Sequence, residues 1–158
     1  MQDLVSLRPV EADDLPIFFA HQLDPEAARL AAFPSRDREA FFTHWTTKII
    51  GNTASTNRTI LLDGQVAGYI GSWTDADSCE RLLCYWLGRE FWGRGIASTA
   101  VSQFQRSETT RPLMARVVKH NVGSIRVLEK AGFTRTGEEA FTLPDGTPCA
   151  EFIYILSA

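Results

Sequence analysis

Two glycines, Gly93 and Gly95, lie directly before a segment whose apolar residues recur at helical spacing. The first N–H groups of a helix have no partners within it, and the helix dipole places a partial positive charge there. Glycines let such a backbone approach an anion closely, so a diphosphate can be held without a lysine. No Gly-Lys-Ser/Thr follows, which excludes a Walker loop. A dinucleotide fingerprint would need a third glycine where Ser98 stands.

A second group of polar residues follows one predicted strand later. Asn121 precedes a helical segment that contains Ser124 and ends in Glu-Lys-Ala-Gly-Phe at residues 129–133. Asn is a favoured N-cap residue, so Asn121 has a local structural role as well as a possible ligand contact. Ser124 falls in the first turn of the same helix, where a serine is also unremarkable.

Together these motifs resemble the GNAT superfamily of N-acetyltransferases, and within it the RimJ/RimL-like branch. The superfamily signature Gln/Arg-x-x-Gly-x-Gly/Ala reads here as residues 92–97, WGRGIA, with Trp92 in place of Gln or Arg. The branch commonly has tryptophan there, and it also carries Asn-x-x-Ser before a helix that ends in EKAGF. The resemblance extends to SLRPVEADDL near the N-terminus and to EFIYIL near the C-terminus. It implies a single N-acetyltransferase domain over residues 1–158.

The resemblance implies acetyl-CoA as co-substrate and a wedge between two splayed central strands. The pantetheine arm would pair with the backbone of Tyr85, Trp86 and Leu87, as an added strand does. Backbone N–H groups from Arg94 to Ser98 would hold the pyrophosphate, and amides near Leu87 would polarise the thioester carbonyl. The implied cofactor-binding residues are Tyr85, Trp86, Leu87, Trp92, Gly93, Arg94, Gly95, Ile96, Ala97, Ser98, Asn121, Ser124 and Lys130. Lys130, like Arg126, would face the 3′-phosphate of CoA.

Catalytic roles follow from the same resemblance. Ser124 matches the position from which this branch is thought to protonate the leaving thiolate, and Tyr85 is either a second acid or a wall of the substrate site. The branch often carries a glutamate just before the Tyr-Trp pair, but Leu82 stands there. A water chain that ends on a nearby carboxylate is therefore the expected route for the proton of the amine, with Glu80 as first choice. Other candidates are Asp75, Asp77, Glu138, Glu139 and His120.

Alternating and helical patterns predict the elements that position these residues. A short strand at 4–8 precedes helices between residues 13 and 50, the last capped by Ser35. Asp63-Gly64 joins two strands as a hairpin, and the apolar run at 81–88 suits a central strand buried on both faces. A helix, a strand, a helix and two closing strands complete an α/β domain around a mixed sheet. The N-terminal helices and the two hairpins would shape the acceptor pocket, with Phe33 or Phe41 facing the ligand or packed in the core.

The composition limits the partners and the compartment. Of 158 residues, 44% are apolar and 22% charged, the net charge is −3, and we find no run of Lys or Arg. A nucleic-acid partner is therefore not expected. No apolar run approaches the roughly 18 residues of a membrane span, so no membrane partner is expected either. The odd count of three cysteines indicates reduced thiols in a cytoplasmic protein, as a monomer or homodimer.

The side chains predict no metal site, because the cysteines and histidines lie in no ligand spacing. Cys84 is expected to be a core residue rather than a nucleophile, since no base for it is evident. The favoured activity is direct transfer of an acetyl group to a primary amine, of a small molecule or a protein N-terminus. The alternatives are a non-catalytic acyl-CoA-binding sensor or interaction module on the same fold and, more remotely, a nucleotide-phosphate enzyme.

Overall fold

A computed structural model describes residues 4–157. Seven strands form one mixed sheet in the order β1-β2-β3-β4-β5-β7-β6, in which only the β4–β5 pair is parallel. The strands are β1 (Val5–Pro9), β2 (Ser55–Leu62), β3 (Gln65–Thr74), β4 (Arg81–Leu87), β5 (Leu113–Val118), β6 (Thr134–Thr142) and β7 (Pro148–Leu156). This confirms the predicted α/β class and places the apolar run of β4 at the centre of the sheet.

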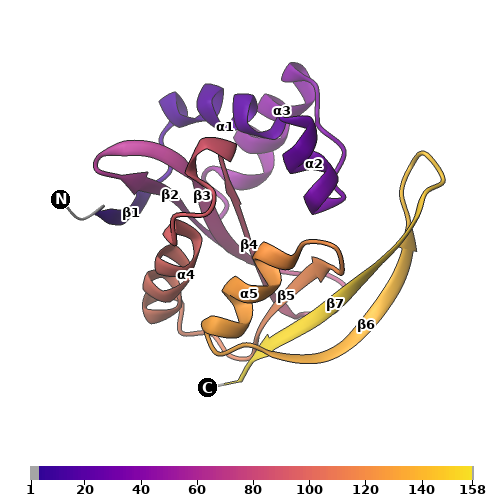
Figure 1. Ribbon diagram of the computed structural model, residues 1–158. Coiled ribbons are helices and arrows are strands. Elements are labelled where there is room, and N and C mark those ends of the chain that lie inside the picture. The colour runs from indigo at the N-terminus through magenta and orange to yellow at the C-terminus, as the bar shows by residue number, and fades with distance from the viewer. Residues whose placement is uncertain (1–3, 158) are drawn as a thin grey trace.

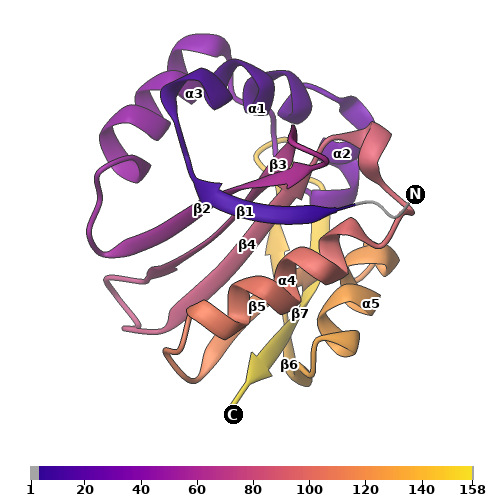
Figure 2. The ribbon, with the colours of Figure 1, turned by 90° about the vertical axis from the view of Figure 1, so that its left-hand side faces the viewer.

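Helices cover both faces of the sheet (Figures 1 and 2). The N-terminal helices lie on one face and α4 and α5 on the other, while the β6–β7 hairpin projects from the body. The helices are η1 (Ala12–Asp14), α1 (Leu15–Gln22), α2 (Pro25–Ala31), α3 (Arg38–His44), η2 (Trp45–Ile49), η3 (Arg89–Phe91), α4 (Ile96–Ser107) and α5 (Val122–Lys130). Within residues 4–157 we find no helix that is long and apolar enough to cross a membrane.

The parallel pair at the centre of the sheet separates soon after it begins. β4 and β5 are paired only at Arg81 with Leu113 and at Leu82 with Met114. Beyond Leu82 the edge of β4 that faces β5 is released from the sheet, although β4 continues to Leu87. The predicted splayed strand pair is therefore present, and it opens towards the N-termini of α4 and α5.

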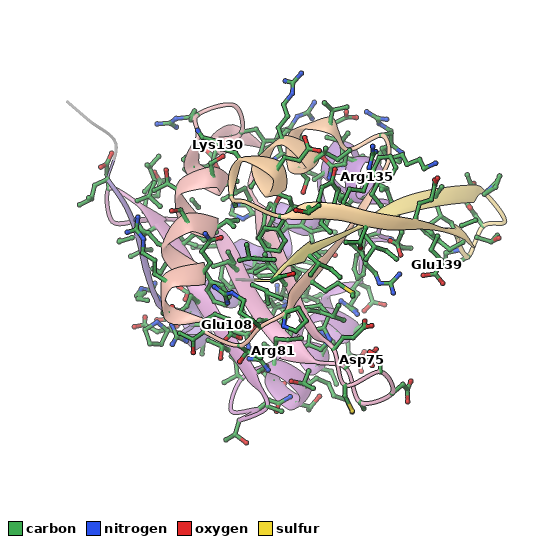
Figure 3. All side chains as sticks on the ribbon, turned by 90° about the horizontal axis from the view of Figure 1, so that it is seen from below. Asp75, Arg81, Glu108, Lys130, Arg135 and Glu139 are labelled. Atoms are coloured by element: carbon green, nitrogen blue, oxygen red, sulfur yellow. The ribbon has the colours of Figure 1, made fainter. Side chains whose placement is uncertain are left out.

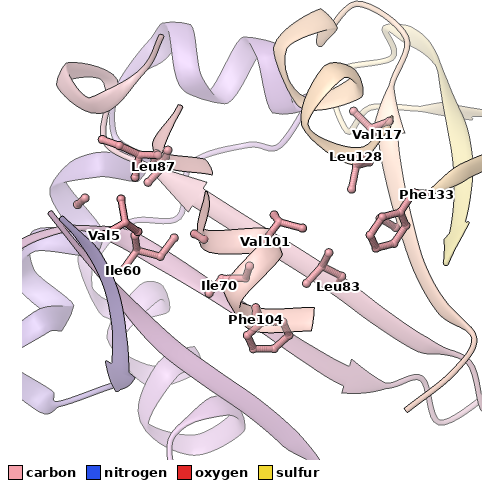
Figure 4. Packing of buried hydrophobic residues seen from close by; sticks show 14 of the residues in the cluster. Val5, Ile60, Ile70, Leu83, Leu87, Val101, Phe104, Val117, Leu128 and Phe133 are labelled. Atoms are coloured by element: carbon pink, nitrogen blue, oxygen red, sulfur yellow. The ribbon is translucent and has the colours of Figure 1, made fainter. Parts of the chain in front are cut away.

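The main core lies between the sheet and the helices α4 and α5. Val101 and Phe104 of α4 pack over Ile70 and Leu83 of the sheet (Figure 4). Each residue of this size that leaves water contributes roughly 1.5–3 kcal/mol. Because these side chains fix α4 on the sheet, they also fix its first turn beside the end of β4.

A second, smaller core holds the N-terminal helices on the opposite face. Phe41 belongs to it and is only 3% exposed, so it does not face a ligand. The predicted cap of its helix was wrong: Asp37, not Ser35, accepts the N–H of Ala40 at the start of α3. Ser35 instead donates its hydroxyl to the carbonyl of Gln22, which holds the preceding loop against α1.

The Asp63-Gly64 turn between β2 and β3 is confirmed. Both residues have positive φ, 51° and 83°. Such a turn has the twist that two antiparallel strands need, and Asp and Gly tolerate it best.

Candidate active site

A cavity of about 470 Å³ opens where β4 and β5 separate. Its walls are the end of β4, the loop and first turn of α4, the turn and first residues of α5, and one side of α2. The site is thus assembled from the four segments that the strand splay leaves facing one another.

The glycine loop forms the floor of one end of this cavity. Gly93 and Gly95 both have positive φ, 71° and 76°, and a Cβ built on either one meets nothing within 4 Å. Both glycines line the cavity, and the space in which a side chain would lie at either position is therefore empty. Within residues 4–157, no side chain caps α4, whose N-cap is Gly95. Among the described residues, the first N–H groups of this 12-residue helix are thus left to an external acceptor, as a diphosphate site requires.

Trp92 ties the loop to the central strand. Its indole Nε1 donates to the carbonyl oxygen of Leu87 at 3.1 Å. The same side chain packs against the main core. The tryptophan that departs from the common motif therefore fixes the distance between the glycine loop and the end of β4.

A pair of hydroxyl groups lies inside the cavity. Tyr85 Oη is 2.5 Å from Ser124 Oγ, so that β4 is joined to the first turn of α5. Burial raises the pKa of the Tyr85 phenol to about 12, although the hydrogen bond with Ser124 acts in the other direction. Tyr85 is therefore a protonated hydroxyl at neutral pH. Asn121 accepts the N–H of Ser124 as the N-cap of α5, at 3.3 Å.

The opposite wall of the cavity is apolar. It consists of Ala27, Leu30 and Ala31 of α2 and the indole of Trp86. Successive residues of a strand point to opposite faces, so Trp86 faces α2 while Tyr85 faces α5. Phe33 is 43% exposed and lies edge-on to Trp86, with ring centroids 6.3 Å apart.

His120 joins the two walls at the end of β5. Its Nε2 lies 2.8 Å from the carbonyl oxygen of Arg29, in α2. A carbonyl only accepts, so Nε2 carries the hydrogen in this contact, and in the neutral ring the lone pair is on Nδ1. His120 is one of the residues that line the cavity.

Most residues named from the sequence are brought together. Every expected cofactor-binding residue lines the cavity except Arg94 and Lys130. Lys130 is the last residue of α5, and Figure 3 shows it well separated from Arg81, at the start of β4.

Glu80 is not brought to the cavity. It precedes β4, about 17 Å along the strand from Tyr85 at roughly 3.3 Å per residue. Its neighbour Arg81 is paired with Glu108 at the end of α4, side by side in Figure 3. This ion pair holds the N-terminal end of β4, where β4 and β5 are still paired. The choice of Glu80 as proton acceptor is therefore corrected: the strand directs it away from the splayed end.

Cys84 has the environment expected of a core residue. Burial raises the pKa of its thiol to about 12, so the reactive thiolate is scarce at neutral pH. No hydrogen bond to its sulfur is found among the described residues. The thiol is therefore poorly suited to carry an acyl group.

The apolar wall from α2 was missed by sequence reasoning. Its alanines and leucine carry no chemical signal, and only the packing of α2 against the end of β5 brings them to the cavity. Phe91 and Val127, which also line it, were missed for the same reason.

A family model described as acetyltransferase (GNAT) domain matches residues 5–134. The chain belongs to this acetyltransferase family. No match is found among curated protein sequences.

Solved structures share the fold over nearly the whole GNAT domain. A spermidine N-acetyltransferase from Vibrio cholerae, in complex with CoA and spermine, superposes with a TM-score of 0.81 at 15% identity, over 97% of this chain and 95% of that one. An acetyltransferase of the GNAT family from Bacillus anthracis gives 0.80 at 16% identity, over 97% and 94%. An aminoglycoside acetyltransferase in complex with coenzyme A gives 0.74 at 19% identity, over 95% and 94%.

Proposed function

We propose that this GNAT domain transfers an acetyl group from acetyl-CoA to a primary amine, as one functional unit over residues 1–158. The observation that carries the proposal is the juxtaposition of an open glycine loop with a protonated hydroxyl pair in the splay of β4 and β5. We further propose that the chain is of the RimJ/RimL-like branch and acts in the cytoplasm, where its unpaired cysteines would stay reduced.

The residues present fit acetyl-CoA. The loop at Gly93 and Gly95 and the first turn of α4 would hold the pyrophosphate through backbone N–H groups. The edge of β4 released after Leu82 would pair with the amides of the pantetheine arm, as in β-strand addition. Acetyl-CoA supplies an activated acetyl group as a thioester. Near the end of β4, the N–H of Gly88 already donates to the carbonyl oxygen of Ala67. We therefore assign polarisation of the thioester carbonyl to the backbone N–H of Leu87.

Ser124 and Tyr85 act as the proton donors. Ser124 gives a proton to the departing sulfur, and Tyr85, 2.5 Å away, replaces it. The raised pKa of Tyr85 keeps the phenol protonated between turnovers. A thiol has a pKa near 8.5, so this acid assists the departure of CoA without being indispensable.

His120 replaces Glu80 as the proposed proton acceptor. The cavity lining contains no carboxylate among the described residues, and its ionisable side chains are Tyr85 and His120. With Nε2–H donated to Arg29, Nδ1 is the free acceptor of the neutral ring. We propose that a water molecule carries the proton of the amine to this nitrogen. An amine of low pKa would need the least assistance.

Transfer is direct, within a complex that holds both substrates. An acyl-enzyme route would need a thiolate, which the environment of Cys84 disfavours. The acceptor lies on the apolar side of the cleft, between α2 and Trp86.

Mass spectrometry of the reaction products tests this function. The protein is incubated with acetyl-CoA and a panel of primary amines, and the amine product is expected to gain one acetyl group. An acyl-CoA sensor of the same fold would bind acetyl-CoA and leave every amine unchanged. Binding without any acetylated product would therefore favour the sensor and overturn the proposal.

A further inference from the structure

The acceptor side of the cavity is unsuited to a polycation. No Asp or Glu of the described chain lines the cavity. On the β6–β7 hairpin, Glu139 and Glu151 are both bonded to Arg116, at 2.6 and 3.1 Å, and Glu138 is paired with Lys119. Spermine and aminoglycosides carry several positive charges, which are stabilised by nearby carboxylates. This site offers an apolar wall instead.

A cation does lie behind that wall. Arg36, half-buried in the loop after α2, is held by its backbone: its N–H donates to Gln22 Oε1 at 2.7 Å, and its carbonyl accepts from Gln22 Nε2 at 2.9 Å. Gln22 is itself buried. The guanidinium lies over the Phe33 ring, 5.2 Å from its centroid, and Phe33 contacts Trp86 in the cavity wall. A fixed loop therefore holds a positive charge next to the acceptor side.

This charge has no carboxylate partner in the part of the chain that the structure describes. Within residues 4–157 we find no ion pair of Arg36, whereas Arg8, Arg29, Arg81 and Arg116 are each paired. Burial raises the pKa of Tyr69, and the charge of Arg36 acts in the opposite direction. The pKa of His44 is lowered by burial first and then by Arg36 and Lys48.

A second donor, in the same wall, also lacks an acceptor within the described part of the chain. Trp86 Nε1 is buried with no hydrogen-bond partner among the described residues. Such a group is costly to leave unpaired. The guanidinium of Arg36 and the indole ring of Trp86 both lie against the Phe33 ring. This side of the cleft thus carries donors and a positive charge without matching acceptors among the described residues.

We propose that the acceptor is a primary amine with an anionic group, such as a carboxylate, on a small apolar body, and that Arg36 selects it. The inference rests on the proposed function and adds the substrate class. The amine lies towards Ser124 and His120, the apolar body between α2 and Trp86, and the anion towards Arg36.

Matched pairs of amines test this class. The kcat/KM for thiol release at saturating acetyl-CoA is compared for phenylalanine and phenethylamine, for 4-(aminomethyl)benzoate and benzylamine, and for spermine. Wild type should prefer the carboxylate member of at least one pair by about 10- to 100-fold, the size of a hydrogen bond to a charged group. Arg36→Met should reduce that preference to about threefold or less, with acetyl-CoA affinity unchanged.

Arg38→Met is the matched control. Arg38 is two residues away and also lies over aromatic rings, those of Phe19 and Phe42, but it is exposed, and neither ring lines the cavity. This variant should keep the wild-type preference. Equal rates within both pairs, a preference for spermine, or an unchanged preference in Arg36→Met would overturn the inference while leaving acetyl transfer intact. No turnover of any amine by a protein that binds acetyl-CoA would overturn the proposed function with it.

Discussion

Tyr85 Oη and Ser124 Oγ lie 2.5 Å apart, although the two residues come from elements that meet only because β4 and β5 separate. The contact links Tyr85, near the end of β4, to the first turn of α5, whose N-terminus is fixed by Asn121. It brings two of the expected catalytic residues to one point, and makes them a connected pair rather than alternatives.

Loss of either hydroxyl should slow turnover more than it weakens binding. Ser124→Ala and Tyr85→Phe should each lower kcat by about 10- to 100-fold with little change in acetyl-CoA affinity, because a proton donor acts mainly in the transition state. The double variant should be hardly slower than the worse single one, since the two groups form one relay. Steady-state kinetics with titration of acetyl-CoA checks this. If the free-energy losses of the single variants add up in the double variant, the two hydroxyls act independently and not as a relay. If Ser124→Ala keeps the wild-type kcat, Tyr85 alone is the acid.

A side chain in the glycine loop should abolish cofactor binding. Gly95→Glu would place an anion where the pyrophosphate approaches α4, adding repulsion to the bulk of the side chain. Wild type should gain several degrees of melting temperature in millimolar acetyl-CoA, and the variant none. Gly64→Glu is the control, because Gly64 also has positive φ and open space around its Cβ position but lies in the β2–β3 turn. Binding retained by folded Gly95→Glu would place the phosphate site elsewhere.

Cys84 should be dispensable and unreactive. Burial raises the pKa of its thiol to about 12, so alkylation at pH 7.5 should label the exposed Cys79 long before Cys84. Cys84→Ala should keep acetyl transfer within about threefold of wild type, since the cost of the lost volume falls on stability. Peptide mapping after timed alkylation, with activity assays of the variant, measures both. An acetyl group trapped on Cys84 of wild type would contradict direct transfer.

Asp14 should stabilise the fold in a pH-dependent way. It is buried, and although burial opposes its charge, hydrogen bonds from Arg8, Thr59 and the backbone of Glu11 hold the pKa of its carboxyl below the usual 3.8. A lowered folded-state pKa gives stability that is present above the unfolded pKa and is lost as pH falls through the folded value.

Asp14→Asn should therefore cost about 3 kcal/mol at pH 7, because it removes the buried carboxylate with which Arg8 is paired at 2.7 Å. Its stability should also fall less steeply than that of wild type as the pH drops below about 4. Urea unfolding at several pH values measures this, with Asp13→Asn, at an exposed neighbour, as the control. Parallel pH profiles of wild type and Asp14→Asn would rule out the linkage.

Local chemistry explains what could be predicted from the sequence. The turn at Asp63, the apolar run of β4 and the apolar stripe of α4 depend on residue type and spacing within a short window. The fold and the glycine loop could therefore be predicted from the sequence. The splay of β4 from β5 came from the family resemblance, because no local pattern encodes where two strands stop pairing.

The acceptor side could not be predicted in the same way. Ala27 and Leu30 face the cavity only because α2 packs near the end of β5, and Glu80 is excluded only by the length of β4. His120 was one of several candidates for the base until its contact with Arg29 distinguished it. Whether these residues reach the acceptor side depends on their position in the tertiary structure and not on their residue type.

The initial rate of CoA thiol release, measured while acetyl-CoA and a primary amine are varied together, tests the central claim most directly. Direct transfer in the β4–β5 cleft predicts negligible release without amine and double-reciprocal lines that intersect, because both substrates must be bound before the thiol leaves. Release that does not depend on any amine, or parallel lines from an acyl-enzyme, would contradict it.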